Sequence, residues 1–180
     1  LGALGDVVRT TAILPGLKKL YPNAEIFWLT SKSALSLVEG LKGVDHVHVL
    51  NELKPKDLPP FDWVISLDDE EEPCRFVSQV EYQKFTGAYW SSQDQKCRYT
   101  DDSDEWFGMG VLRPDNEGGL DKANELKKND QQSHPEIFYS FLNLPGPPAR
   151  PQLPLTVAHK KKAQSWLQQQ KKCSHWVGLN

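Results

Sequence analysis

The sequence predicts an α/β fold with a mostly parallel sheet and helices on both of its faces. Segments rich in β-branched and aromatic residues lie at 25–30, 44–50 and 61–67, and helical or turn-forming segments separate them. The segment 61–67 is apolar almost throughout, as expected for a strand that is covered on both faces. This alternation is typical of parallel strands that are joined by crossover helices.

The first segment of the chain combines two glycines and an aspartate with a helical pattern. Asp6 is expected as the N-cap of a helix, and Gly2 and Gly5 as a loop that lets a ligand approach the backbone and the free N–H groups of that helix. The simpler alternative is that Asp6 only caps the helix. One face of this helix is apolar and carries Val8, Ala12, Leu17 and Leu20, with Ile13 beside them. Three basic side chains point away from that face: Arg9, Lys18 and Lys19.

The rest of the chain continues the alternation and then changes character. Residues 145–154 contain five prolines, which indicates a stiff, extended connector and a domain boundary. A helix and a strand are expected beyond it, at 159–173 and 176–179. Before it we expect helices at 33–41, 73–80, 104–112, 120–126 and from His134 onward, a loop at 51–60, and a hairpin that pairs 82–90 with 97–100.

Composition excludes several classes of protein. The 180 residues carry a net charge of −3, so the basic surface that nucleic-acid binding needs is missing. No apolar run has the length of a membrane span and no signal peptide is visible, which indicates a cytoplasmic protein. Cys74, Cys97 and Cys173 lack any Cys-x-x-Cys spacing, so the sequence predicts reduced thiols rather than a disulfide framework or a zinc site.

Other candidate sites are weaker. Neither G-x-G-x-x-G nor a Walker motif is present. The acidic run 68–72 suits either a divalent cation or the solvated first turn of a helix, and the helix is favoured. His46 and His48 share a strand face and could bind a metal, but the sequence offers no third ligand near them. Ser66 and His134 could join an aspartate in a hydrolase triad, but the Gly-x-Ser-x-Gly motif of such enzymes is missing. We therefore expect no metal site.

Three segments resemble one family of enzymes. Residues 1–17 followed by 21–30, the strand Phe61–Asp68 and the segment His175–Asn180 are similar to the ADP-heptose:lipopolysaccharide heptosyltransferases, glycosyltransferase family 9. Members of this family adopt the GT-B architecture, in which two Rossmann-like domains face each other across the active site. The resemblance implies an N-terminal Rossmann-like acceptor domain at 1–144, a proline-rich linker at 145–158 and the truncated start of a C-terminal donor-binding domain at 159–180.

The same resemblance implies a function. Asp6 corresponds to the catalytic base of an inverting transfer, and the implied substrate-binding residues are Gly2, Ala3, Leu4, Gly5, Arg9, Thr10 and Asn180. The implied donor is a nucleotide sugar such as ADP-heptose, without cofactor or metal. The implied acceptor is a lipopolysaccharide core or related glycan, met in the cytoplasm or at the inner membrane surface. Because the family's donor-binding residues lie in the second domain, this chain alone is expected to be inactive.

Two alternatives come from other classes of protein. The first is a non-catalytic Rossmann-like module that binds a nucleotide or sugar phosphate and in which Asp6 only caps its helix. The second is a phosphotransfer enzyme that uses Asp68 and Asp69 around magnesium.

Overall fold

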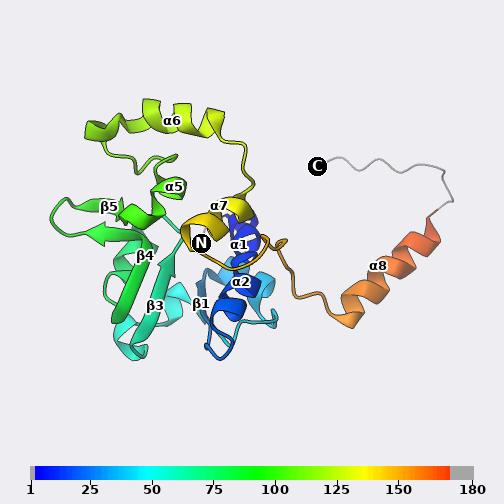
Figure 1. Cartoon of the computed structure of the whole chain (residues 1–180). Coiled ribbons are helices and arrows are strands. Elements are labelled where there is room, and N and C mark those ends of the chain that lie inside the picture. The colour runs from blue at the N-terminus through cyan, green and yellow to red at the C-terminus, as the bar shows by residue number, and fades with distance from the viewer. Residues whose placement is uncertain (1–2, 171–180) are drawn as a thin grey trace.

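The computed structural model describes residues 3–170, and Figure 1 shows their arrangement. Short 3₁₀ turns connect several of the elements, among them Lys32–Ala34 and Asp101–Ser103. The helices and strands follow in chain order: α1 (Leu4–Thr10), α2 (Ile13–Leu20), β1 (Phe27–Thr30), α3 (Leu35–Val38), β2 (His46–Val49), β3 (Phe61–Ser66), α4 (Glu71–Val77), β4 (Tyr82–Ser91), β5 (Lys96–Tyr99), α5 (Asp104–Phe107), α6 (Gly119–Asn129), α7 (His134–Phe141) and α8 (Val157–Gln169).

The strands within residues 3–170 form two sheets. β1 pairs in parallel with β2, from Phe27↔His46 to Thr30↔Val49. β3 pairs in parallel with β4, which turns back through an antiparallel pairing with β5. The protein is therefore a mixed α/β fold with parallel strands, and the predicted hairpin is confirmed. The expectation of a single sheet is wrong for the described part of the chain.

The N-terminal helix differs from the prediction in two ways. The helix predicted to run unbroken to Leu20 is divided into α1 and α2, because Pro15 has no N–H to donate to the carbonyl of Thr11. Leu14 N donates to that carbonyl instead, at 3.2 Å, and Leu20 is exposed rather than buried. The N-cap is Ala3, without a side-chain cap, and Asp6 lies within the first turn. The predicted capping role of Asp6 is therefore wrong.

Helices cover both faces of β3. Adjacent residues of a strand point to opposite faces, and here Ile65 packs against the cluster of α2 and α7 around Phe138. Val64 packs with Phe76 and Val80, from α4 and the turn after it. The sheet of β3, β4 and β5 therefore lies between α4 on one side and the pair α2 and α7 on the other.

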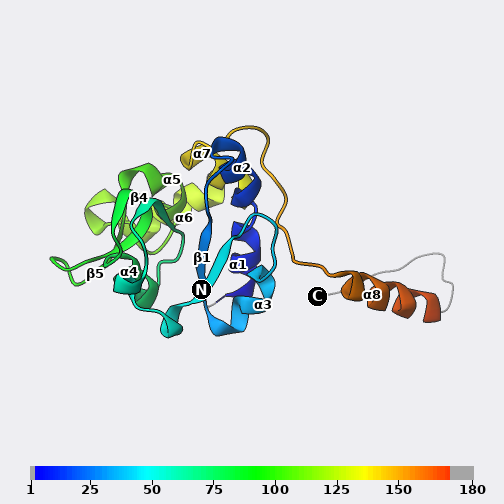
Figure 2. The same cartoon turned by 90° about the horizontal axis from the view of Figure 1, so that it is seen from below.

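The proline-rich connector is extended, as predicted, and its middle is attached to the body of the protein. Gln152 N donates to the hydroxyl of Thr11 at 2.7 Å, and Ala149 packs against the core around Phe138. Beyond the connector, α8 extends away from the other elements and its side chains are exposed (Figures 1 and 2). The strand predicted at 176–179 lies outside the described residues.

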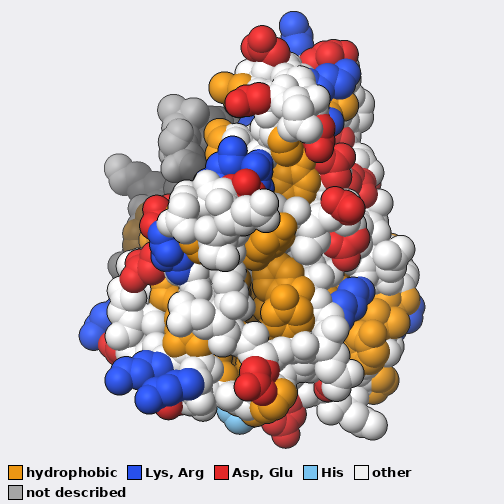
Figure 3. Space-filling view, turned by 90° about the vertical axis from the view of Figure 1, so that its left-hand side faces the viewer, with side chains coloured by type: hydrophobic (Ala, Val, Ile, Leu, Met, Phe, Trp, Pro, Cys, Tyr) orange, Lys and Arg blue, Asp and Glu red, His pale blue; other side chains and the backbone are white. Residues whose placement is uncertain are grey.

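The surface mixes apolar and charged side chains. On the face drawn in Figure 3, hydrophobic side chains form a strip, with acidic side chains gathered beside it. Among residues 3–170, no helix combines the length and the apolar character that crossing a membrane requires.

Candidate functional site

Asp6 presents its carboxylate to solvent from the first turn of α1. Its side chain is 53% exposed and forms an ion pair with Arg9, one turn further along the same helix. The N-terminal end of a helix favours negative charge, and an adjacent guanidinium favours the ionised form of a carboxylate. Asp6 is thus an accessible carboxylate whose orientation is restrained by its neighbour.

Arg9 connects α1 with α7. Its Nη1 donates to Nε2 of His134 at 3.0 Å, so the guanidinium lies between a carboxylate and an imidazole. The sequence pattern predicted that Arg9 points away from the apolar face of its helix, and its side chain is 42% exposed while it contacts α7. An acidic, a basic and a neutral titratable group therefore meet at one point of the surface.

His134 is held in its neutral form. Burial lowers the pKa of its imidazole, and the positive charge of Arg9 lowers it further. The ring centroids of Trp106 and His134 lie 5.2 Å apart, and the two rings meet edge to face at 70°. His134 is the first residue of α7, which is capped by a reciprocal box between Ser133 and Glu136. A sequence pattern for a helix start located His134 but did not reveal its partner.

The other predicted substrate-binding residues fall into two groups. Ala3, Leu4 and Gly5 are exposed around Asp6, and nothing lies within 4 Å of the position that a Gly5 side chain would take. Thr10 donates its hydroxyl to the carbonyl of Val7 at 2.9 Å, so only its acceptor capacity remains for a ligand. Gly2 and Asn180, named with them, lie outside the described residues.

The acidic run after β3 is accounted for by local structure. Glu71 and Glu72 are in the first turn of α4, and Glu71 pairs with Arg75 at 2.7 Å. Asp68 accepts a hydrogen bond from Glu70 N at 3.0 Å. In residues 3–170, no group of three or more His, Cys, Asp or Glu side chains is arranged to hold a metal ion.

The structure also bears on the two histidines of β2 and on the hydrolase triad considered from the sequence. Phe27 stacks on His46 and on His48, with ring centroids 4.2 and 6.0 Å away. Both histidines thus contribute to aromatic packing on the first sheet. Within residues 3–170, Ser66 makes no hydrogen bond to His134, so the structure does not assemble the hydrolase triad.

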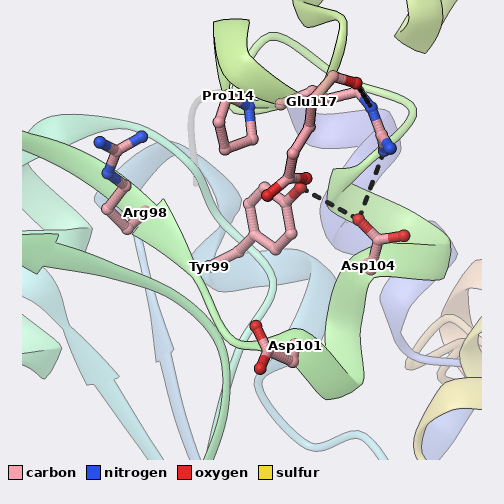
Figure 4. A pocket seen from close by; sticks show the side chains of 7 residues that line it. Arg98, Tyr99, Asp101, Asp104, Pro114 and Glu117 are labelled. Atoms are coloured by element: carbon pink, nitrogen blue, oxygen red, sulfur yellow. Dashed lines mark hydrogen bonds and ion pairs between the residues drawn. The ribbon is translucent and has the colours of Figure 1, made fainter.

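A pocket of about 300 Å³ lies between β5, α5 and the turn after α5 (Figure 4). The hydroxyl of Tyr99 donates to Asp104 at 3.0 Å, and Arg113 approaches the same carboxylate at 3.4 Å. Burial and the bond to Asp104 raise the pKa of Tyr99 to about 12, so the phenol stays protonated. Carboxylate, guanidinium and phenol groups together suit a ligand with many hydroxyls. The lining residues are Arg98, Tyr99, Asp101, Asp104, Arg113, Pro114 and Glu117.

The sequence did not indicate this pocket, because its residues come from β5, α5 and the turn after α5 without a recognisable spacing. The pocket is connected through α5 to the cluster formed by Asp6, Arg9 and His134. Asp104 lines the pocket and Trp106, two residues later, contacts His134.

Comparisons with known proteins add nothing to this geometry. No family model, no curated protein and no solved structure matches the chain. The functional argument therefore depends on the residues of the site.

Proposed function

We propose that this chain is the acceptor domain of an inverting glycosyltransferase of GT-B architecture, with a nucleotide sugar such as ADP-heptose as donor. The acceptor is a lipopolysaccharide core or related glycan, reached from the cytoplasm. The observation that carries the proposal is the exposed carboxylate of Asp6 at the first turn of α1, paired with Arg9. The resemblance of residues 1–30 to heptosyltransferases supports the same residue as the base.

In the proposed reaction, Asp6 accepts the proton of an acceptor hydroxyl. The hydroxyl oxygen then forms a bond to the anomeric carbon of the donor, while the bond from that carbon to the nucleoside diphosphate breaks and the leaving group keeps the electron pair. An ionised carboxylate suits the first step because it only accepts hydrogen bonds. Its position in α1, beside the exposed Ala3, Leu4 and Gly5, leaves the carboxylate open to solvent, which supports this role.

Arg9 positions the base in this mechanism. It bonds His134 at 3.0 Å as well as Asp6, so the guanidinium is restrained from two sides and in turn restrains the carboxylate. Gly2, Thr10 and Asn180 complete the proposed contacts to the substrates. No metal takes part in the proposed steps.

The test is a transfer assay on the protein as encoded in full, with ADP-heptose and a heptose-deficient lipopolysaccharide core. Asp6→Asn keeps the shape of the side chain but removes the base, and we expect transfer to fall roughly 10²–10⁴-fold with unchanged circular dichroism. The control is Asp57→Asn, an exposed aspartate on a 3₁₀ turn, which should retain activity. Full activity of Asp6→Asn would reject the base.

The second candidate is a non-catalytic module that binds a sugar phosphate, and the pocket of Tyr99 and Arg113 favours it. The two arginines of that pocket supply donors for a phosphate, and Tyr99 supplies a face for a sugar ring. Binding of a nucleotide sugar that is unaffected by Asp6→Asn, together with no transfer under any condition, would favour this candidate over the first.

A further inference from the structure

Two cysteines that are far apart in the sequence meet between α4 and β5. Cys74 of α4 is completely buried, and Cys97 of β5 is half-buried. Both belong to one apolar cluster, together with Ala88 and Phe107. They share no sequence motif, so only the fold brings the two thiols together.

The contacts of α4 with the hairpin define the position of Cys74. One turn after it, the hydroxyl of Ser78 accepts a hydrogen bond from Trp90 N at 2.9 Å. Arg75, which directly follows Cys74 in α4, stacks its guanidinium 3.5 Å from the centre of the Trp90 ring. Trp90 is the cross-strand neighbour of Cys97 in the antiparallel register. α4 is therefore held against the part of the hairpin that contains Cys97.

The two thiols are neighbours in this cluster, and the surroundings of Cys74 keep it protonated. Burial raises the pKa of the Cys74 thiol, and the neighbouring thiol of Cys97 and the charge of Asp69 raise it further. The Cys74 thiol donates to the carbonyl of Asp68 at 3.4 Å. At neutral pH Cys74 is thus a protonated thiol, and the more accessible Cys97 is the sulfur that an oxidant meets first.

We propose that Cys74 and Cys97 are a modification site, at which a peroxide converts the two thiols into a reversible disulfide between α4 and β5. The thiolate of Cys97 attacks one oxygen of hydrogen peroxide, which breaks the O–O bond and yields a sulfenic acid and hydroxide. The sulfur of Cys74 then attacks the sulfur of Cys97 and gives its proton to the sulfenic oxygen, so that an S–S bond forms, the S–O bond breaks and water leaves. In total, two thiols lose two electrons and two protons, and one peroxide becomes two waters.

The disulfide has a defined structural consequence. It removes the S–H donor of Cys74 from the carbonyl of Asp68, at the turn that joins β3 to α4. It also ties α4 to the hairpin and closes the loop from Cys74 to Cys97, which restricts the unfolded chain. Oxidation therefore stabilises the three-stranded sheet and removes one hydrogen bond to the acidic turn beside it.

The experiment uses the whole chain with Cys173→Ser, so that a third thiol does not interfere. After hydrogen peroxide treatment, intact mass spectrometry should show the loss of two hydrogen atoms and a peptide that links Cys74 to Cys97. Dithiothreitol should reverse both changes, and the oxidised form should melt about 5–10 °C higher. Cys97→Ser and Cys74→Ala should each prevent the mass loss.

Two results would overturn the proposal. One is accumulation of sulfinic acid on Cys97 with no crosslink, which would show that Cys74 does not reach it. The other is a crosslink that forms only in denaturant, since the folded arrangement would then not be responsible. Because Cys97 is half-buried in an edge strand, Cys97→Ser should fold, and its circular dichroism checks this.

Discussion

Arg9 and His134 lie 125 residues apart in the chain and are joined by a hydrogen bond of 3.0 Å from Nη1 to Nε2. Because the guanidinium always donates, Nε2 must be unprotonated for this bond to exist. Arg9 also pairs with Asp6, so the protonation state of His134 affects the restraint on the exposed carboxylate. A helix that begins at His134 thus completes a cluster that starts in the first turn of α1.

We expect stability to decrease in acid because of His134. Burial and the charge of Arg9 lower the pKa of the folded imidazole below its usual value of about 6.5, while Lys127 and Asp130 nearby act in opposite directions. Between the two pKa values the unfolded chain binds more protons, so the stabilisation is complete above about pH 6.5 and is lost as the pH falls through the folded pKa. Thermal unfolding from about pH 8 to about pH 5 measures this loss.

His134→Gln is the control for that measurement. Glutamine can accept from Arg9 without titrating, so the variant should lose less stability in acid than the unsubstituted protein. The two proteins differ only at residue 134, so the difference between their pH profiles reports on His134. Identical pH profiles would contradict the role of His134.

Thr11→Val should destabilise the fold by about 1–3 kcal/mol. The hydroxyl of Thr11 is completely buried, donates to the carbonyl of Val8 at 2.7 Å and accepts from Gln152 N at 2.7 Å. Valine has the same shape but removes the acceptor of Gln152 N, while the carbonyl of Val8 keeps its bond from Thr11 N. Urea denaturation gives the free energy of unfolding, and Thr10→Val, which affects only a bond within α1, should change it by less than about 0.5 kcal/mol.

Gly87→Ala should be among the most destabilising single changes, at about 3 kcal/mol or more. Gly87 has a φ of +118°, and a Cβ at this position would lie 1.9 Å from the carbonyl oxygen of Ser66 on β3. The clash is with backbone, so the pairing of β3 with β4 has to shift. Thermal unfolding of the variant measures the cost.

Gly5→Ala should stabilise the fold, in contrast to Gly87→Ala. Gly5 lies inside α1, and nothing lies within 4 Å of the added Cβ, so alanine should stabilise the helix by about 0.4–1 kcal/mol. A loss of stability would show that the chain at Gly5 is not helical. If substrates pass close to this position, as we propose, the same variant should also bind them less tightly.

Phe138→Ala should cost about 3–5 kcal/mol. Phe138 is 1% exposed at the centre of the cluster between α2, α7 and β3, and its ring lies 5.0 Å from that of Trp106. Tyr82→Ala is the matched control, because Tyr82 is 48% exposed and should cost far less. Denaturant titrations measure the free energy of unfolding, and equal losses in the two variants would contradict the central position of Phe138 in the core.

Much of the secondary structure was predictable, because it depends on neighbours in the sequence. The strand 61–67 and the hairpin after Tyr82 were found from apolar patterning and turn residues, and β3, β4 and β5 confirm them. The helix at His134 was found from its start signal and apolar face. The errors fall where one residue outweighs the pattern, as at Pro15, whose missing N–H divides the first helix.

The candidate site was predictable only in part. Asp6 was named as its central residue, and the structure leaves its carboxylate accessible, as the proposed role requires. Its connection through Arg9 to His134, and the pocket around Tyr99, were not foreseen. No pattern along the chain relates α1 to α7 or β5 to α5, because their contacts join residues far apart in sequence.

By itself the sequence determined the class of the fold, the places of most strands and helices, and a candidate acidic residue, since these follow from hydrophobic periodicity and residue type over short distances. Only the tertiary structure decided which side chains meet: Arg9 with His134, Tyr99 with Asp104, and Cys74 with Cys97. The physical reason is that such pairs follow from how helices and strands pack on the sheets.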